Sequence, residues 1–79
     1  MAVHDLKVWP EEFEAMVQHL KEFEIRKDDR GFHVGDSLAL REFDPKKGRL
    51  TGRVVFRMVR YMVKGQFGLP ADICVMQLG

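Results

Sequence analysis

Residues 3–26 read VHDLKVWPEEFEAMVQHLKEFEIR, and the spacing of the apolar residues changes twice within this stretch. From Val3 to Val8 apolar and polar residues alternate, which is typical of a half-buried strand. After Trp9 and Pro10 the apolar residues recur at helical spacing, at Phe13, Met16, Val17 and Leu20. A period of two returns from Phe23 to Arg26. The stretch therefore predicts a strand, a helix of about three turns and a second strand that follows with almost no linker.

The rest of the chain predicts three more strands. Glycines and aspartates mark residues 28–36 as a loop, and the runs 37–43, 53–63 and 73–78 are typical of strands. The apolar residues change parity near Arg57 to Arg60, which indicates either a β-bulge or a strand buried on both faces. The order β-α-β-β-β-β predicts a mainly β member of the α+β class, a five-stranded barrel that is closed or nearly closed. We expect these residues in its core: Phe13, Val17, Leu20, Phe23, Ile25 and Leu38.

Length and composition limit the classes of protein. The chain has 79 residues, of which 46% are hydrophobic and 32% charged, as in a soluble globular domain. No window offers the ~18 uncharged apolar residues of a membrane-spanning helix. We therefore expect a single domain over residues 1–79, monomeric and cytoplasmic, with no membrane partner and no cofactor. Cys74 is the only cysteine, which excludes an intrachain disulfide and a multi-cysteine zinc site.

Charge is segregated along the chain although the net charge is only +1. Residues 1–44 contain eleven acidic and six basic residues, whereas residues 45–71 contain seven basic residues and no acidic one. Such an asymmetry is expected where one face of a domain meets an anion. The alternative is that these basic side chains are solvated or pair with the acidic half.

The segment HLKEFEIR, residues 19–26, resembles the Gly-x-Lys-x-x-Glu-x-Arg signature of the ASCH family within the PUA-like barrels. Lys21, Glu24 and Arg26 stand at the motif positions, and His19 replaces the glycine. The His-x-Leu-Lys at residues 4–7 and the Val-Gly-Asp at residues 34–36 extend the likeness over most of the chain. The sequence is thus similar to small bacterial or phage ASCH-like proteins of the DUF3850 type. This resemblance implies a PUA-like barrel and, by analogy, RNA binding.

The residues of the motif also predict a site on physical grounds. Lys21 ends the predicted helix and Glu24 and Arg26 share one face of the next strand, so the three charged groups can converge on a cleft. A carboxylate between two cations holds both and presents their remaining donors to an anion or a base edge. The alternative is an ordinary ion-pair network. His4 and Arg30 are further candidates for ligand contacts, although a histidine on this strand face is more often a packed, hydrogen-bonded core residue and Arg30 equally suits a cap of its turn. We expect four basic residues to contact phosphates: Lys46, Lys47, Arg53 and Arg57.

Other residues have simpler interpretations. Trp9 has the chemistry to stack a base, but a buried tryptophan that anchors a small core is the more common use. The histidines show no metal-binding spacing, so no metal site is expected.

The sequence thus leaves three functions open. The first is a module that binds RNA, single-stranded nucleic acid or a nucleotide. The second is a small amidohydrolase acting on an acylated or modified nucleoside, with Lys21 and Glu24 as catalytic residues. Some ASCH proteins use such a lysine beside a hydroxyl residue and a carboxylate, and this chain has Glu24 where the hydroxyl would lie. The third is an adaptor for a phage or host protein.

Overall fold

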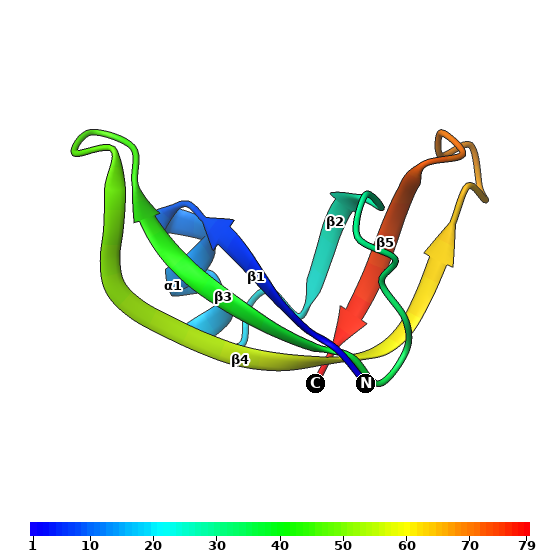
Figure 1. Cartoon of the computed structure of the whole chain (residues 1–79), viewed down its shortest axis with the longest axis horizontal. Helices are drawn as coiled ribbons and strands as arrows, with labels where there is room; N and C mark the ends of the chain where they lie inside the picture. Colours follow the sequence, from blue (N-terminus) through cyan, green and yellow to red (C-terminus); the bar gives the residue numbers. More distant parts are fainter.

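Strand β4 (Arg49–Lys64) is the longest element and belongs to both halves of a five-stranded mixed sheet. The computed structural model describes residues 1–79. The other elements are β1 (Val3–Val8), α1 (Pro10–Val17), β2 (Phe23–Lys27), β3 (Ser37–Asp44) and β5 (Ile73–Leu78) (Figure 1). The predicted mainly β fold with one helix is confirmed. No helix is long and apolar enough to cross a membrane.

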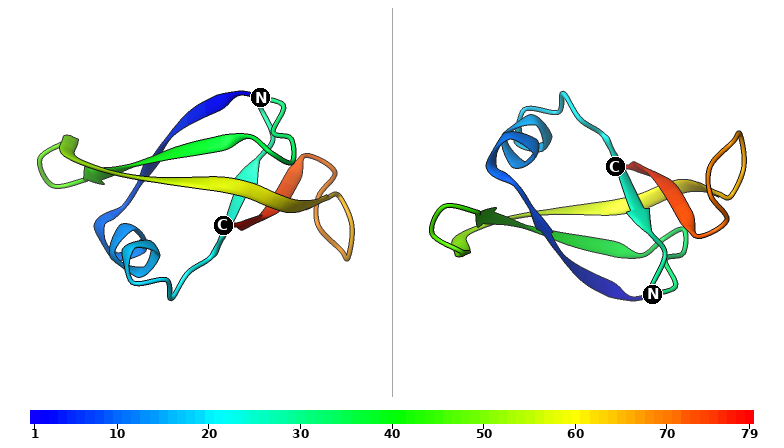
Figure 2. Two further views of the ribbon diagram at one scale, coloured as in Figure 1. Left: turned by 90° about the horizontal axis from the view of Figure 1, so that it is seen from below. Right: turned by 90° about the horizontal axis from the view of Figure 1, so that it is seen from above.

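The sheet is divided into two wings that diverge from the middle of β4 (Figure 1). Its strand order is β1-β3-β4-β5-β2, and only the pair of β1 with β3 is parallel. The first wing consists of β1, β3 and the N-terminal part of β4, and the second consists of β2, β5 and the C-terminal part of β4. Helix α1 packs on β3 and β4. It lies at the opposite end of the molecule from the loop at residues 65–72 (Figure 2).

The sequence predicted a barrel that is closed or nearly closed, and the sheet of the structure is not a closed barrel. β1 and β2 are the two edges of the sheet and share no backbone ladder. A backbone ladder needs strands about 4.8 Å apart. Between β1 and β2 the Arg26 side chain makes the contact instead. Arg26 of β2 reaches across this seam to the backbone oxygen of Lys7 on β1, at 2.8 Å. The sheet therefore stays open between β1 and β2.

A β-bulge at Arg60 allows β4 to serve both wings. The register of β4 against β5 shifts between Val59 and Tyr61. This is the segment where the change of apolar parity indicated either a bulge or a strand buried on both faces, and the structure has the bulge. A bulge adds one residue to a strand, bends it and changes which residues face the core. The apolar residues before the bulge lie partly on the exposed face of the sheet, at Val54, Phe56 and Met58.

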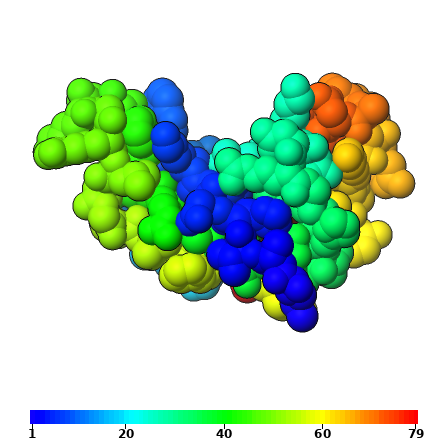
Figure 3. Space-filling model, viewed as in Figure 1, coloured from blue at the N-terminus to red at the C-terminus, as the bar shows by residue number.

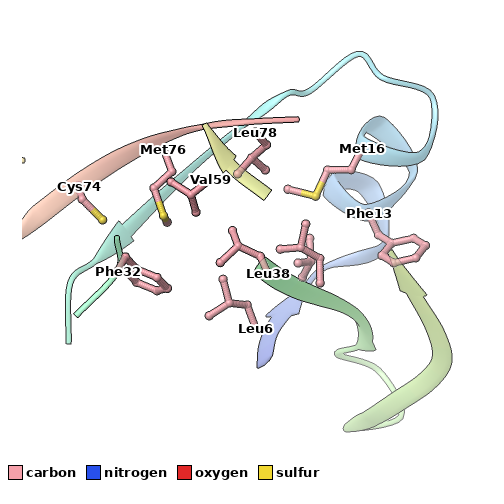
Figure 4. Close-up of a cluster of buried hydrophobic side chains, with 11 residues drawn as sticks. Leu6, Phe13, Met16, Phe32, Leu38, Val59, Cys74, Met76 and Leu78 are labelled. Carbon is pink, nitrogen blue, oxygen red and sulfur yellow. The ribbon is translucent and has the colours of Figure 1, made fainter. Parts of the chain in front are cut away.

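The core is a cluster of eleven buried residues that joins the two wings (Figure 4). Phe13 and Met16 of α1 lie at one end of the cluster and Phe32 and Cys74 at the other (Figure 4). β1, α1, β3, β4 and β5 all contribute apolar side chains to it, whereas the buried residue of β2 is Glu24. The inner face of β2 is therefore polar, and this polarity creates the candidate site.

Only two of the six residues predicted in the core are buried, Phe13 and Leu38. The other four are exposed: Val17, Leu20, Phe23 and Ile25. The helix ends at Val17, about one turn earlier than expected, so Leu20 lies beyond its apolar stripe. On β2 the inward position belongs to Glu24, which leaves Phe23 and Ile25 on the exposed face because side chains alternate along a strand.

Candidate functional site

An open groove of about 1170 Å³ lies between the wings, at the seam where the sheet fails to close (Figure 3). Its walls are the end of β1, the first turn of α1, the whole of β2 and the turn at residues 44–46. Cationic side chains line it, at Lys7, Lys21, Arg26, Lys27 and Lys46. Carboxylates line it as well, at Glu11, Glu12, Glu24 and Asp44. The groove is thus a mixed-charge surface with a slight excess of cations.

Glu24 holds two cations at the floor of the groove. Its Oε2 accepts a hydrogen bond from Arg26 Nε at 2.6 Å, and its Oε1 lies 3.4 Å from Lys21 Nζ. Lys21 Nζ also lies 3.2 Å from Oε1 of Glu12. Glu24 is 3% exposed, so its charge depends on these two partners rather than on water. The structure therefore brings Lys21, Glu24 and Arg26 together at a solvent-accessible groove, as the motif predicted.

The end of α1 places Lys21 at the groove. His19 N–H donates to Met16 O at 3.1 Å, and Leu20 N–H donates to Ala15 O at 2.8 Å. This pair of bonds is a Schellman motif, which ends a helix with one residue in the left-handed conformation. His19 is that residue, with φ of 59°. The turn brings the chain back so that Lys21 lies beside the first turn of the helix.

Arginine side chains satisfy the open edge of β1. Arg26 Nη2 donates to Lys7 O at 2.8 Å, and Arg30 Nη1 donates to Asp5 O. Asp5 and Lys7 are two residues apart, so their carbonyl groups point to the same side of β1. The two guanidinium groups therefore replace a strand along this seam and protect an edge that would otherwise pair with another chain. Arg30 has this role outside the groove, because it is not among the residues that line it.

The comparison with protein families covers the chain from the start of β1 to the end of β5. The family described as "Domain of unknown function (DUF3850)" matches residues 3–78. The chain belongs to this family. No curated protein matches the sequence. All the residues that line the groove of this DUF3850 domain lie within the matched region.

His4 of the DUF3850 domain lies outside the groove, although the sequence suggested it as a ligand residue. Its Nε2 donates to Asp36 Oδ2 at 2.9 Å, and its ring packs edge-on against Phe32. Asp36 also accepts the backbone N–H groups of Ala2 and His33. The hydrogen bond from His4, together with these backbone donors, lowers the pKa of Asp36 to about 2. His4 thus connects β1 to the loop that precedes β3.

Two neighbouring lysines on the turn between β3 and β4 occupy different surfaces. Lys46 lines the groove, whereas Lys47 lines a smaller hollow with Arg49 and Thr51. Both backbone N–H groups donate to Oδ1 of Asp44, which fixes the turn. Of the two phosphate contacts predicted here, only Lys46 is therefore placed beside the motif residues.

Arg53 and Arg57 are held by helix α1. Arg57 Nη2 donates to Met16 O at 2.9 Å, at the C-terminal end of the helix. The Arg53 guanidinium lies 3.4 Å from the Glu14 carboxylate and over the Phe13 ring. Neither arginine lines the groove. The phosphate contacts predicted for them are therefore not part of this site, because their charges neutralise and cap the helix.

Trp9 lines the groove, although the sequence favoured a buried anchor over a base-stacking residue at this position. The indole is 63% exposed and lines the groove, so the expected buried anchor was wrong. Trp9 stands between the end of β1 and the start of α1, where it is exposed at the wall of the groove. The Trp9-Pro10 pair at the end of the strand indicates a bend in the chain. It does not indicate whether other side chains cover Trp9 at this bend.

Neither a histidine nor a cysteine lines the groove. No group of three or more His, Cys, Asp or Glu side chains converges closely enough to hold a metal ion. Cys74 is buried in the second wing, and burial raises the pKa of its thiol. It therefore serves as a small core residue.

Proposed function

We propose that this domain binds RNA, single-stranded nucleic acid or a nucleotide in the groove between its wings. The observation that carries the proposal is the pair of cations, Lys21 and Arg26, held by buried Glu24 at the floor of an open groove. Lys7 and Lys46 line the same groove and have no carboxylate partner, and Lys7 Nζ lies over the Phe43 ring at 5.0 Å. Such unpaired lysines attract phosphate groups and release their counterions on binding.

The resemblance to the ASCH signature supports the same assignment. The motif residues Lys21, Glu24 and Arg26 are among the residues that line the groove, and RNA binding is what that family implies. We further propose that the fold is an opened form of the PUA-like barrel, in which the arginine-bridged seam takes the place of the last ladder. On this view the seam is open because it serves as the binding surface.

The two held cations keep donors for a ligand. Lys21 Nζ has three N–H groups and two carboxylate partners. Arg26 uses Nε for Glu24 and Nη2 for Lys7 O, which leaves Nη1 available. Because Glu24 and the backbone fix both groups before a ligand arrives, little side-chain entropy is lost on binding. The arrangement suits recognition of a base edge or a terminal phosphate.

The composition of the groove favours binding over hydrolysis. The proposed amidohydrolase needs a hydroxyl group beside the catalytic lysine, and no Ser, Thr, Tyr or Cys lines the groove. Glu12 does supply a carboxylate 3.2 Å from Lys21. With one of the three required groups absent, Lys21 and Glu24 are better suited to hold a ligand than to cleave one.

The test is a fluorescence anisotropy titration of a labelled single-stranded RNA of about eight nucleotides at several salt concentrations. If about three phosphates are contacted, the logarithm of affinity should fall with the logarithm of salt at a slope near −2. Lys46→Ala should weaken binding and make the slope shallower by about 0.7. Lys47→Ala is the matched control, because it removes the same charge from the same turn but outside the groove.

Two results contradict the proposal. One is the absence of binding even at low salt. The other is an equal effect of Lys46→Ala and Lys47→Ala, since a diffuse surface contact does not distinguish the two lysines. Either result would favour an adaptor that binds a protein partner.

A further inference from the structure

Trp9 is an aromatic surface without a partner. The indole is 63% exposed at the groove. The other aromatic ring of the groove, Phe23, already has Lys21 Nζ over its face at 5.4 Å. No such cation and no second ring stacks on Trp9. A large apolar ring left open beside cationic side chains is characteristic of a surface that stacks a ligand.

The backbone of Trp9 is fixed before any ligand binds. It precedes Pro10, which disfavours the helical conformation, and its φ and ψ of −71° and 155° are extended. Its carbonyl accepts the first hydrogen bond of α1, from Phe13 N–H at 2.8 Å. The side chain therefore moves only about its own two torsions, and ordering it costs little on binding.

The edge of β2 that borders the groove has free hydrogen-bonding groups. Glu22 O accepts from Leu78 N–H, and Asp28 N–H donates to Asp72 O. Antiparallel pairing uses alternate residues of a strand, so the even-numbered residues of β2 bond to β5. The odd-numbered residues consequently point their N–H and C=O groups to the opposite, unpaired edge. Lys27 O already accepts Asp29 N–H at 2.9 Å, which leaves the N–H and C=O groups of Phe23 and Ile25 on this edge. Each such residue offers one donor and one acceptor side by side, as the edge of a base does.

We infer that the groove takes an unpaired base of a single-stranded RNA, stacked on Trp9 with its hydrogen-bonding edge toward β2. The adjacent phosphates lie toward Lys7 and Lys46, which line the same groove. This inference rests on the proposed function and narrows it, because a base inside a duplex is already stacked and paired. An apolar peptide would cover Trp9 but would leave the two lysines unused.

Trp9 is the only tryptophan of the chain, so its fluorescence reports the contact directly. The protein is titrated with three ligands: a single-stranded RNA of about eight nucleotides, its duplex, and a tetrahydrofuran-spacer oligomer that has the same phosphates but no bases. Stacking should quench the emission with the single strand only. In the anisotropy assay, Trp9→Ala should weaken binding of the single strand about tenfold, whereas Trp9→Phe should retain most of it.

Phe67→Ala is the control variant, because Phe67 is 88% exposed on the loop at the other end of the molecule. It should leave the affinity unchanged. If the single strand binds but Trp9 emission does not change, or if the spacer oligomer binds equally well, the inference is overturned while the proposed function stands. If no oligomer binds, both are overturned.

Discussion

His19 has a left-handed backbone conformation, which the turn after α1 requires and which a residue with a side chain disfavours. It is the left-handed residue of the turn that ends α1, with φ of 59°. In the ASCH signature that the sequence resembles, this position is a glycine, and glycine alone takes a positive φ without a steric cost. The replacement keeps the turn, and the motif residues that follow still meet at the groove.

The first prediction concerns this residue. His19→Gly should raise the free energy of unfolding by about 1 kcal/mol, because it relieves the left-handed conformation. Gln18→Gly is the matched control, since Gln18 has a φ of −85° and gains nothing from glycine. It should lower the free energy of unfolding by about 0.5–1 kcal/mol. Urea denaturation measures both, and a similar loss for the two variants would show that the turn carries no strain.

The second prediction concerns Asp36. Its pKa is about 2 in the folded protein, against an ordinary value of 3.8, with the hydrogen bond from His4 as the main cause. Since the folded pKa is depressed, the stabilisation is full above pH 3.8 and is lost as the pH falls through about 2. Asp36→Asn should therefore be less stable than the wild type at neutral pH, and the difference should shrink over this interval. Urea midpoints at stepped pH test this, and a difference independent of pH would contradict it.

The alternating pattern of β2 predicted a strand but did not predict which of its two faces is buried. The period of two predicted the strand correctly, but the inward face was expected to carry Phe23 and Ile25. The structure turns Glu24 inward instead. Alternation is symmetric between the two faces, and a one-residue change of parity exchanges them. Only the partners Lys21 and Arg26, which the fold brings to Glu24, make the polar face the buried one.

The third prediction tests that role of Glu24. Glu24→Ala should lower the free energy of unfolding by about 2 kcal/mol, because Lys21 and Arg26 lose a charged hydrogen-bond acceptor that is buried. Glu22→Ala is the matched control, because Glu22 lies on the same segment and is exposed. It should change the stability by less than about 0.5 kcal/mol. Equal effects in thermal or urea unfolding would mean that the cluster adds nothing to the fold.

In the whole molecule the fold partly neutralises the charge segregation seen in the sequence. Of the seven basic residues between positions 45 and 71, Arg53 pairs with Glu14, Lys64 pairs with Asp28, and Arg57 caps α1. These partners come from the acidic N-terminal half, as one of the two sequence interpretations allowed. Lys46 is the member of this set that reaches the groove. The basic surface is therefore smaller than the linear sequence indicated.

The sequence predicted the strands and located the irregularity of β4, for which it left a bulge and a strand buried on both faces open, because these features depend on local spacing and on turn chemistry. It did not predict the open seam, which depends on Arg26 and Arg30 replacing a ladder between strands distant in the chain. The exposure of Trp9 was not predicted for the same reason. The distance between the two wings decides whether a side chain at such a bend is buried. The local spacing of residues in the sequence does not predict that distance.

The central claim is that the groove between the wings is the binding surface for single-stranded RNA. The most direct test is a titration of ¹⁵N-labelled protein with such an RNA, followed by two-dimensional NMR. The account predicts that the indole N–H of Trp9 and the backbone amides of β2 and Lys46 shift together. The amides of Arg53 to Arg57, which lie against α1, should stay in place. Shifts confined to β4, or no shifts at all, would contradict the account.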